Sequence, residues 1–280
     1  MRFESATLPA RPGTPNQDLI VSGPDVVVLL DGAGGPSEDG GGCLHGVHWY
    51  VRQLGSRLLG GLLTGREPLA ELLARAIDSV ASVHRSTCDL RHPGTPSSTV
   101  AMVRRSEDTF EYLALHDSTI VLSGSDGSRA VSDRRLQRIP ELRSLWARRD
   151  QLRLGTDAHA VARRACIAAE LDFRNTPAGY WVAGADPHSA AEAISATVPA
   201  ADLRAVSLLS DGVADYVDAY RLATWPQVVE VLDRTGPAGL IRLVRAAERS
   251  DATGRRWPRF KVHDDASAAH WTVTPPVEVP

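Results

Sequence analysis

The sequence predicts an α+β fold, because strand patterns and helix patterns fall into separate runs along the chain. Its 280 residues, 43% hydrophobic and 23% charged, have the composition of a globular domain that can bury its own core. A regular alternation of one strand with one helix, typical of a parallel sheet, is not seen. We expect a single domain over residues 1–274, followed by a disordered, proline-containing tail over 275–280.

The first half of the chain predicts two strands and then two helices. The segments "DLIVS" and "DVVVLLD" are strand-like, and a Gly23-Pro24 turn separates them. A glycine-rich stretch follows, and apolar residues then recur at helical spacing in two long segments that we expect to be antiparallel. The expected elements are strands at 18–22 and 25–31 and helices at 43–63 and 67–86.

The second half predicts further strands, a largely helical region and a closing strand. Asp126-Gly127 is typical of a hairpin turn, and a buried strand ends on Asp211-Gly212. A basic, loop-like segment, "DATGRRWPRFKV", precedes the last strand. The expected strands are 97–104, 109–116, 118–124, 128–132, 179–184, 203–212 and 264–273; the helical segments are 134–170, interrupted near Gly155, 213–221 and 226–250.

The overall charge and the cysteines narrow the class of protein. A net charge of −3 with scattered arginines favours neither a nucleic-acid partner nor a membrane partner. No segment approaches the ~18 apolar residues of a membrane span, and the N-terminus lacks the apolar core of a signal peptide, so we expect a cytoplasmic protein. Lys261 is the only lysine, a bias typical of a GC-rich bacterial genome. Cys43, Cys88 and Cys166 stand apart without a CxxC pair, so we expect neither a disulfide framework nor a zinc ribbon.

The stretch "VVVLLDGAGG" over residues 26–35 allows two interpretations. A dinucleotide-binding loop would need a third glycine where Ser37 stands, and the charges of Glu38 and Asp39 would repel a pyrophosphate. It would also need a parallel strand after a single helix, whereas two long helices follow. The other interpretation, a carboxylate at a strand end that binds a metal ion, is therefore favoured.

A metal site for a hard divalent cation requires several oxygen ligands, so other carboxylates should stand at comparable strand ends. They do, and the list is Asp18, Asp117, Asp211 with Asp215, Asp264 and Asp265. Each alone is explained as well by a turn or a helix cap, as we expect for Asp126. The ordered series is harder to explain in that way.

This order of motifs resembles the metal-dependent Ser/Thr protein phosphatases of type 2C, in their bacterial branch. The matching motifs span about residues 11–274, and each is short. They are Asn16-Gln17-Asp18, Asp31-Gly32-Ala33-Gly34-Gly35, Ser97-Ser98-Thr99-Val100, His116-Asp117-Ser118-Thr119, Ser210-Asp211-Gly212 and Asp264-Asp265.

The resemblance implies a four-layer α-β-β-α sandwich, in which two antiparallel sheets are flanked by helix pairs. It implies two Mn²⁺ or Mg²⁺ ions that activate a water molecule for in-line attack on a phosphoserine or phosphothreonine of a protein substrate. The implied partner is a phosphorylated protein, and the implied opponent is a Ser/Thr kinase. The implied metal ligands are Asp31, which bridges both ions, the Gly32 carbonyl, Asp211 and Asp264, with Asp117 and Asp215 at a weaker third ion. Asp18 and Asp31 are the implied catalytic residues, and Asp18 would orient the water.

The sequence departs from the family pattern where substrate is handled. Gln17 stands where the family usually has glutamate, and Ala33 replaces the histidine that serves as general acid in the animal enzymes. The phosphate-binding arginine is displaced: its position holds Gly13, and Arg11 is the nearest substitute. Two hypotheses therefore stay open, an active phosphatase and a degenerate phosphatase-like domain that acts as a non-catalytic phosphoprotein-binding or regulatory module.

Three histidines have uncertain roles. His116 replaces the glycine of the family's Gly-Asp-Ser-Arg motif, so it is either a functional residue near the metals or a partly buried histidine at a strand end. His45 and His48 lie three residues apart on an expected helix, a conceivable ligand pair. Because no third ligand is evident, zinc is not expected there.

Overall fold

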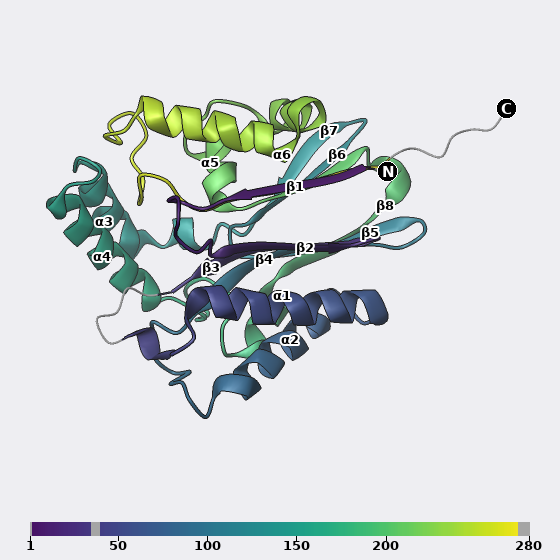
Figure 1. Ribbon diagram of the computed structural model, residues 1–280, viewed down its shortest axis with the longest axis horizontal. Coiled ribbons are helices and arrows are strands. Elements are labelled where there is room, and N and C mark those ends of the chain that lie inside the picture. Colours follow the sequence, from purple (N-terminus) through teal and green to yellow (C-terminus); the bar gives the residue numbers. More distant parts are fainter. Residues whose placement is uncertain (1, 35–39, 274–280) are drawn as a thin grey trace.

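The computed structural model describes residues 2–34 and 40–273 (Figure 1). Two five-stranded antiparallel sheets pack face to face, and helices cover the outer face of each. The predicted α+β sandwich is therefore confirmed. Ser37, Glu38, Asp39 and the predicted tail at 275–280 lie outside the described residues.

The first sheet contains Asp31 and the apolar strand that precedes it. Its order is β2 (Asp18–Gly23), β3 (Val26–Ala33), β4 (Ser97–Arg105), β5 (Thr109–Leu115) and β8 (Ile194–Pro199). Helices α1 (Gly46–Thr64) and α2 (Leu69–His84) pack on its outer face. Side chains alternate along β3, so Val28 and Leu30 face these helices while Val27 and Leu29 face the other sheet.

The second sheet has the order β1 (Arg2–Leu8), β10 (Ala266–Thr272), β9 (Ala205–Leu209), β6 (Thr119–Gly124) and β7 (Gly127–Val131). Helices α5 (Asp211–Asp218) and α6 (Trp225–Ser250) cover it. Helix α6 is interrupted at Gly236, which has a φ of 67° and precedes Pro237. Glycine adopts that left-handed conformation without steric cost, and proline has no N–H to continue the hydrogen-bond ladder.

The predicted strands differ from the structure at the sheet edges. Strands β1 and β8 were not predicted, and both are edge strands with mostly exposed side chains, so their sequences lack a clear apolar alternation. The strand predicted at 179–184 is wrong: this segment forms only isolated bridges, including one between Ser98 and Ala183. Its apolar residues pack instead against the helical segment described next.

Helices α3 (Pro140–Asp150) and α4 (Asp157–Leu171) lie together at one end of the sandwich (Figure 1). A small separate core, including Leu142, Tyr180 and Val182, packs them against the 179–184 segment, which bridges to Ser98 of β4. Short 3-10 turns lie at η1 (Gly40–Gly42), η2 (Leu136–Arg138), η3 (Pro187–Glu192) and η4 (Ala200–Asp202). None of the described helices combines the length and apolar content that crossing a bilayer requires.

Candidate active site

Asp31 lies at the end of β3, where the strand reaches the edge of the sandwich. It follows Val27 and Leu29 on the face that packs against the second sheet. Ser98 on β4 donates its hydroxyl to the Asp31 carbonyl at 3.0 Å. The neighbouring strand β2 places Asp18 directly opposite Asp31 in the antiparallel register. Both carboxylates therefore belong to the inter-sheet face at one end of the sandwich.

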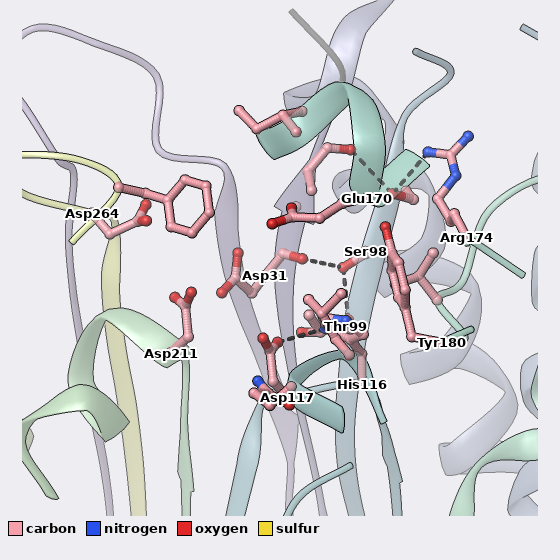
Figure 2. Close-up of a pocket in the computed structure, with 18 of the residues that line it drawn as sticks. Asp31, Ser98, Thr99, His116, Asp117, Glu170, Arg174, Tyr180, Asp211 and Asp264 are labelled. Atoms are coloured by element: carbon pink, nitrogen blue, oxygen red, sulfur yellow. Dashed lines mark hydrogen bonds and ion pairs between the residues drawn. The ribbon is translucent and has the colours of Figure 1, made fainter. Parts of the chain in front are cut away.

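Six aspartates from four parts of the chain line one cavity of about 580 Å³ at this end. They are Asp31, Asp117, Asp211, Asp215, Asp218 and Asp264. Figure 2 shows Asp31, Asp117, Asp211 and Asp264 facing a common space. Asp211 and Asp215 begin successive turns of α5, so they share one helix face, and Asp264 lies in the loop before β10. The structure thus brings together the strand-end carboxylates that the sequence singled out.

Burial and mutual repulsion make this cluster unfavourable as a set of free carboxylates. Burial raises the pKa of Asp31 and of Asp211 well above the ordinary value, and the charges of neighbouring aspartates raise both further. For the same two reasons the pKa of Asp215 is raised to about 7. A divalent cation would favour the ionised forms, because opposite charge offsets both effects.

Asp18 does not line this cavity; it lines a smaller one of about 360 Å³. Its side chain is buried, and neither carboxylate oxygen has a hydrogen-bond partner within the described residues. Burial raises its pKa to about 7; the charges of Asp265 and Asp264 act in the same direction, while the nearby hydroxyls of Ser267 and Ser210 act against it. An unpartnered buried carboxylate behind an all-oxygen cluster fits a centre for Mg²⁺ or Mn²⁺, which prefer oxygen ligands and keep water in their coordination shell.

Gly32 is required by the packing of α1 on the sheet. A Cβ at this position would come within 2.5 Å of Val47 and 2.7 Å of the Gln17 carbonyl oxygen. Its N–H donates to that same carbonyl at 3.1 Å, and Gly32 and Gln17 both line the cavity. The residue after Asp31 therefore has to be a glycine for the backbone to lie against helix α1.

Asp117 stands where the chain crosses from the first sheet to the second, between β5 and β6. His116 precedes it in the left-handed region, with a φ of 69°, which is uncommon for a residue with a side chain. The His116 Nδ1 lies 2.7 Å from the Asp117 carboxylate oxygen, and His116 also lines the cavity. Burial of Asp117 opposes its ionisation, but the His116 charge and hydrogen bond hold its pKa below the ordinary value.

The basic residues of the cavity are not those predicted. Arg11 is exposed and does not line the cavity, so the structure does not bring it to the carboxylates. The cations that do line it are Arg134, Arg163, Arg174 and Lys261. Arg163 comes from α4 and Arg174 from the loop that follows it, a region for which the sequence offered only a helical pattern. Lys261 belongs to the basic segment before β10 and lies 2.6 Å from Asp264.

Asp265 supports the site from behind. Its carboxylate accepts hydrogen bonds from the N–H groups of Ala10 and Gln17, at 2.7 and 2.8 Å. These bonds tie the loop before β2 to the start of β10. The second residue of the Asp264-Asp265 pair thus fixes the backbone next to Asp18, while the first faces the cavity.

The cysteines and histidines differ from the sequence expectation. Cys43 and Cys88 do not stand apart: their sulfur atoms lie 3.5 Å from each other, and the His45 ring lies beside both. His48 is not paired with His45; its Nδ1 lies 2.9 Å from the Asn16 carbonyl oxygen. The sequence could not show this arrangement, because the ligand pairs are about forty residues apart and meet only through the helix packing.

Part of the chain matches the model of a known protein family. The model of the Protein phosphatase 2C family matches residues 9–138, a range that contains Asp18, Asp31 and Asp117. A search of the curated proteins found no match. Asp211, Asp215 and Asp264 lie beyond the matched range and join the cluster through the fold.

Solved structures match the whole chain in fold. The catalytic domain of the serine/threonine phosphatase PstP, in complex with two manganese ions, aligns with a TM-score of 0.58 at 13% identity, covering 98% of both chains. Stp1 from Staphylococcus aureus aligns with a TM-score of 0.58 at 12% identity, covering 98% of this chain and 95% of that one. The phosphatase MsPP from Mycobacterium smegmatis, in complex with cacodylate, gives 0.54 at 14%, covering 98% and 99%.

The family model matches the first half of the chain, and the solved bacterial serine/threonine phosphatases share its fold over nearly the whole length. The resemblance that the motifs indicated is therefore confirmed. The solved bacterial members share the sandwich over nearly the full length of the chain, although few of their residues are identical to it.

Proposed function

We propose that this protein is a metal-dependent phosphatase that hydrolyses phosphoserine and phosphothreonine in proteins through a two-metal-activated water. The observation that carries the proposal is the convergence of six aspartates on one cavity at the end of the sandwich, with Asp18 buried opposite Asp31 on the neighbouring strand. Mutual repulsion contributes to the raised pKa values of Asp31, Asp211 and Asp215, and bound cations would offset that repulsion. The manganese ions of the similar PstP structure support the same interpretation.

The donor set fits two Mn²⁺ or Mg²⁺ ions. Asp31 would bridge them, the Gly32 carbonyl, Asp211 and Asp264 would complete their shells, and Asp117 with Asp215 would hold a weaker third ion. When bound, such ions act as Lewis acids on the phosphoryl oxygens and lower the pKa of water. Asp18 would act as a hydrogen-bond acceptor that orients the attacking water, since its buried carboxylate stands opposite Asp31.

The substrate phosphate would be held by the arginines of the cavity. Arg174 donates to the Thr95 carbonyl at 3.0 Å and contacts the Ser97 hydroxyl at 3.5 Å, which fixes its position beside the cavity. A guanidinium held in this way can present its remaining N–H groups to a phosphate. Arg163 enters the cavity from α4. We propose these two residues for the role that the sequence assigned to Arg11.

A second function, that of a non-catalytic phosphoprotein-binding or regulatory module, is favoured by Gln17, Ala33 and the exposed position of Arg11. Either function would place the protein opposite a Ser/Thr kinase, and we propose the bacterial cytoplasm as its location. The two functions differ in turnover. A catalytic domain should release phosphate from p-nitrophenyl phosphate and from a phosphothreonine peptide when Mn²⁺ is present, and EDTA should stop the release. Binding of the peptide without any release would instead establish the module.

A further inference from the structure

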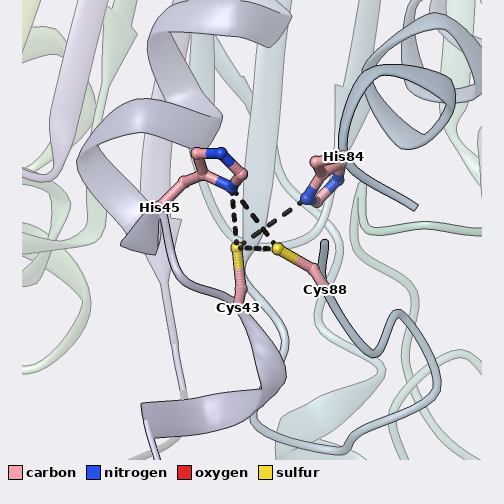
Figure 3. Close-up of side chains that lie close together, drawn as sticks. All are labelled: Cys43, His45, His84 and Cys88. Carbon is pink, nitrogen blue, oxygen red and sulfur yellow. Dashed lines mark hydrogen bonds between the residues drawn. The ribbon is translucent and has the colours of Figure 1, made fainter. Parts of the chain in front are cut away.

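A second group of metal-ligating side chains lies away from the aspartates, at the outer end of the α1–α2 helix pair. Its members are Cys43, His45, His84 and Cys88, and one potential ligand atom from each lies within 4.8 Å of all the others (Figure 3). Cys43 follows η1, and His45 directly precedes α1. His84 is the last residue of α2, and Cys88 follows in the next turn.

The distances match a single tetrahedral ion. Zinc bonds of about 2.3 Å to sulfur and 2.0–2.1 Å to nitrogen would place the ligand atoms about 3.3–3.8 Å apart. The two sulfurs are 3.5 Å apart, and the Cys43 sulfur lies 3.9 Å from the His45 Nδ1 and 3.7 Å from the His84 Nδ1. The Cys88 sulfur lies 3.4 Å from the His45 Nδ1. These four separations are close to the edge lengths of such a tetrahedron, and the two remaining pairs of ligand atoms lie within 4.8 Å.

Local contacts hold the four ligand side chains in place. The N–H of Cys88 donates to the His84 carbonyl at 3.0 Å, which extends the helical turn and places the two side chains on one face. The Trp49 ring stacks on the His45 ring, with centroids 4.3 Å apart, and lies 5.0 Å from the His84 ring. His84 is fully buried and Cys43 nearly so, whereas His45 is exposed, which leaves a path for an ion to enter.

We propose that these four residues form a structural zinc site of the Cys₂His₂ type. Four protein ligands leave no open coordination position, so the ion would serve the fold and not catalysis. Thiolate and imidazole ligands select zinc, whereas the oxygen ligands of the aspartate cluster select Mg²⁺ or Mn²⁺. The chain would then hold two chemically distinct kinds of metal site.

The zinc would join the start of α1 to the segment that leads from α2 into the candidate active site. The Asp89 N–H donates to the Gly42 carbonyl at 2.8 Å, and the Thr95 hydroxyl donates to the Asp89 carbonyl at 2.9 Å. Thr95 in turn accepts the hydrogen bond from Arg174. An ion bound to these four residues would therefore stabilise the backbone that supports Arg174, because the site exists only in the folded state and the free energy of binding adds to the stability of that state.

A disulfide between Cys43 and Cys88 is the competing explanation for their proximity. It would require the sulfur atoms to approach to about 2.05 Å, and it would leave the convergence of two histidine rings unexplained. The two explanations differ in the number of free thiols. Zinc binding preserves all three cysteines of the chain as thiols, whereas the disulfide leaves only Cys166.

The test uses the full-length protein. Zinc content is measured by mass spectrometry after gel filtration, and the optical spectrum is recorded after replacement of zinc by Co²⁺. We expect about one zinc per chain and the sulfur-to-cobalt charge-transfer band of a tetrahedral thiolate site, which the aspartate cluster cannot produce because it contains no sulfur. Thiols are counted after unfolding in EDTA, without reductant, and three are expected.

Variants then assign the ligands. The double variant Cys43→Ser/Cys88→Ser and the variant His45→Asn should lose the zinc, the cobalt band and thermal stability. The controls Cys166→Ser and His48→Asn should keep the zinc and the band, because neither residue belongs to the cluster. If the double variant fails to fold, the wild-type cobalt spectrum and thiol count decide alone. A wild-type protein without the cobalt band, or with one free thiol, overturns the proposal, as does zinc retained by a folded double variant.

Discussion

Asp18 and Asp31 stand directly opposite each other on β2 and β3, and both carboxylates lie on the inter-sheet face where the strands end. Side chains at paired positions of antiparallel strands are neighbours, so the register itself brings two negative charges together. Only one of the two lines the cavity. The pair therefore gives a geometric basis for a division of roles, with Asp31 as the proposed metal ligand and Asp18 as the proposed acceptor behind it.

Replacing Asp31 should separate activity from folding. We expect Asp31→Asn to abolish Mn²⁺-dependent phosphatase activity, because a neutral amide cannot bridge two cations. The metal-free variant should be at least as stable as the wild type, since a buried repulsive charge has been removed. Thermal unfolding in EDTA and initial rates in Mn²⁺ measure the two effects, and Asp126→Asn in the exposed β6–β7 turn is the control. A metal-free Asp31→Asn variant with a clearly lower melting temperature would contradict the repulsion argument.

The raised pKa of Asp18 predicts how the stability of the metal-free protein changes with pH. Its pKa rises from 3.8 in the unfolded chain to about 7 in the fold. The folded state therefore holds a proton that the unfolded state releases between these values, and stability falls as pH rises through this window. The contribution is fully present below the unfolded pKa and is lost above the folded one.

The variant Asp18→Asn isolates this contribution, because it removes the titrating group at nearly constant volume. In EDTA the variant should be more stable than the wild type at about pH 8, and the difference should shrink toward about pH 5. Denaturant unfolding at several pH values measures it. Addition of Mn²⁺ should reverse the order at high pH if ions bind beside Asp18. A difference that stays constant over this range would mean that Asp18 does not titrate there.

The fold and the carboxylate positions could be predicted because they depend on local patterns. Asp31 follows five apolar strand residues, and Asp211 follows another strand, so each is visible as a charge at the end of a buried segment. Edge strands such as β1 were missed because their exposed faces leave little apolar alternation. That these carboxylates share one cleft was predicted only from the resemblance, because the sequence around Asp31 or Asp211 does not show which residues lie beside it.

The cations and the Cys/His cluster could not be predicted, because they depend on tertiary contacts. Arg174 reaches the cavity only because a bridge between Arg174 and Tyr180 and a hydrogen bond to Thr95 fix its loop. Cys43 and Cys88 meet only because α1 and α2 pack antiparallel with matching ends. The sequence does show a Cys/His pair before the first helix, Cys43 and His45, and another at the end of the second, His84 and Cys88. The long separation between the two pairs matches no short metal-binding motif.

Gln17 should set the metal requirement. It lines the cavity next to Gly32 and brings a neutral amide where a carboxylate would bring a charge. We expect Gln17→Glu to lower the half-saturating Mn²⁺ concentration roughly tenfold, because one added charge near an ion is worth about 1–2 kcal/mol. The metal-free variant should be less stable than the wild type. Superimposable metal titrations of the two proteins would show that Gln17 does not contact the ions.

Arg174 should affect substrate binding more than Arg11 does. We expect Arg174→Lys to raise KM for a phosphopeptide about tenfold or more, because a bidentate contact to phosphate is worth roughly 1.5–3 kcal/mol and lysine cannot reproduce it. Arg11→Lys should leave KM unchanged, since Arg11 is exposed and outside the cavity. Steady-state kinetics of both variants at saturating Mn²⁺ provide the comparison. The reverse ranking would restore Arg11 as the phosphate-binding residue.

His116 tests whether the backbone beside Asp117 is strained. A residue with a Cβ at a φ of 69° costs about 1–2 kcal/mol relative to glycine. This cost offsets part of the stability that the contacts of the His116 side chain contribute. These contacts are a hydrogen bond of 2.7 Å to Asp117 and a ring contact with Tyr180 at a centroid distance of 4.9 Å. Both His116→Gly and His116→Ala remove these contacts, but only glycine also removes the backbone cost.

We therefore expect His116→Gly to be more stable than His116→Ala by about 1 kcal/mol, despite the general preference for alanine over glycine in folded chains. Urea unfolding of the two variants in EDTA measures the difference, and the matched pair cancels the lost histidine contacts. Glycine stands at this position in the motif that the sequence resembles, so His116→Gly should keep the proposed metal-dependent activity. An alanine variant as stable as the glycine variant would show that this residue does not adopt the left-handed conformation in solution.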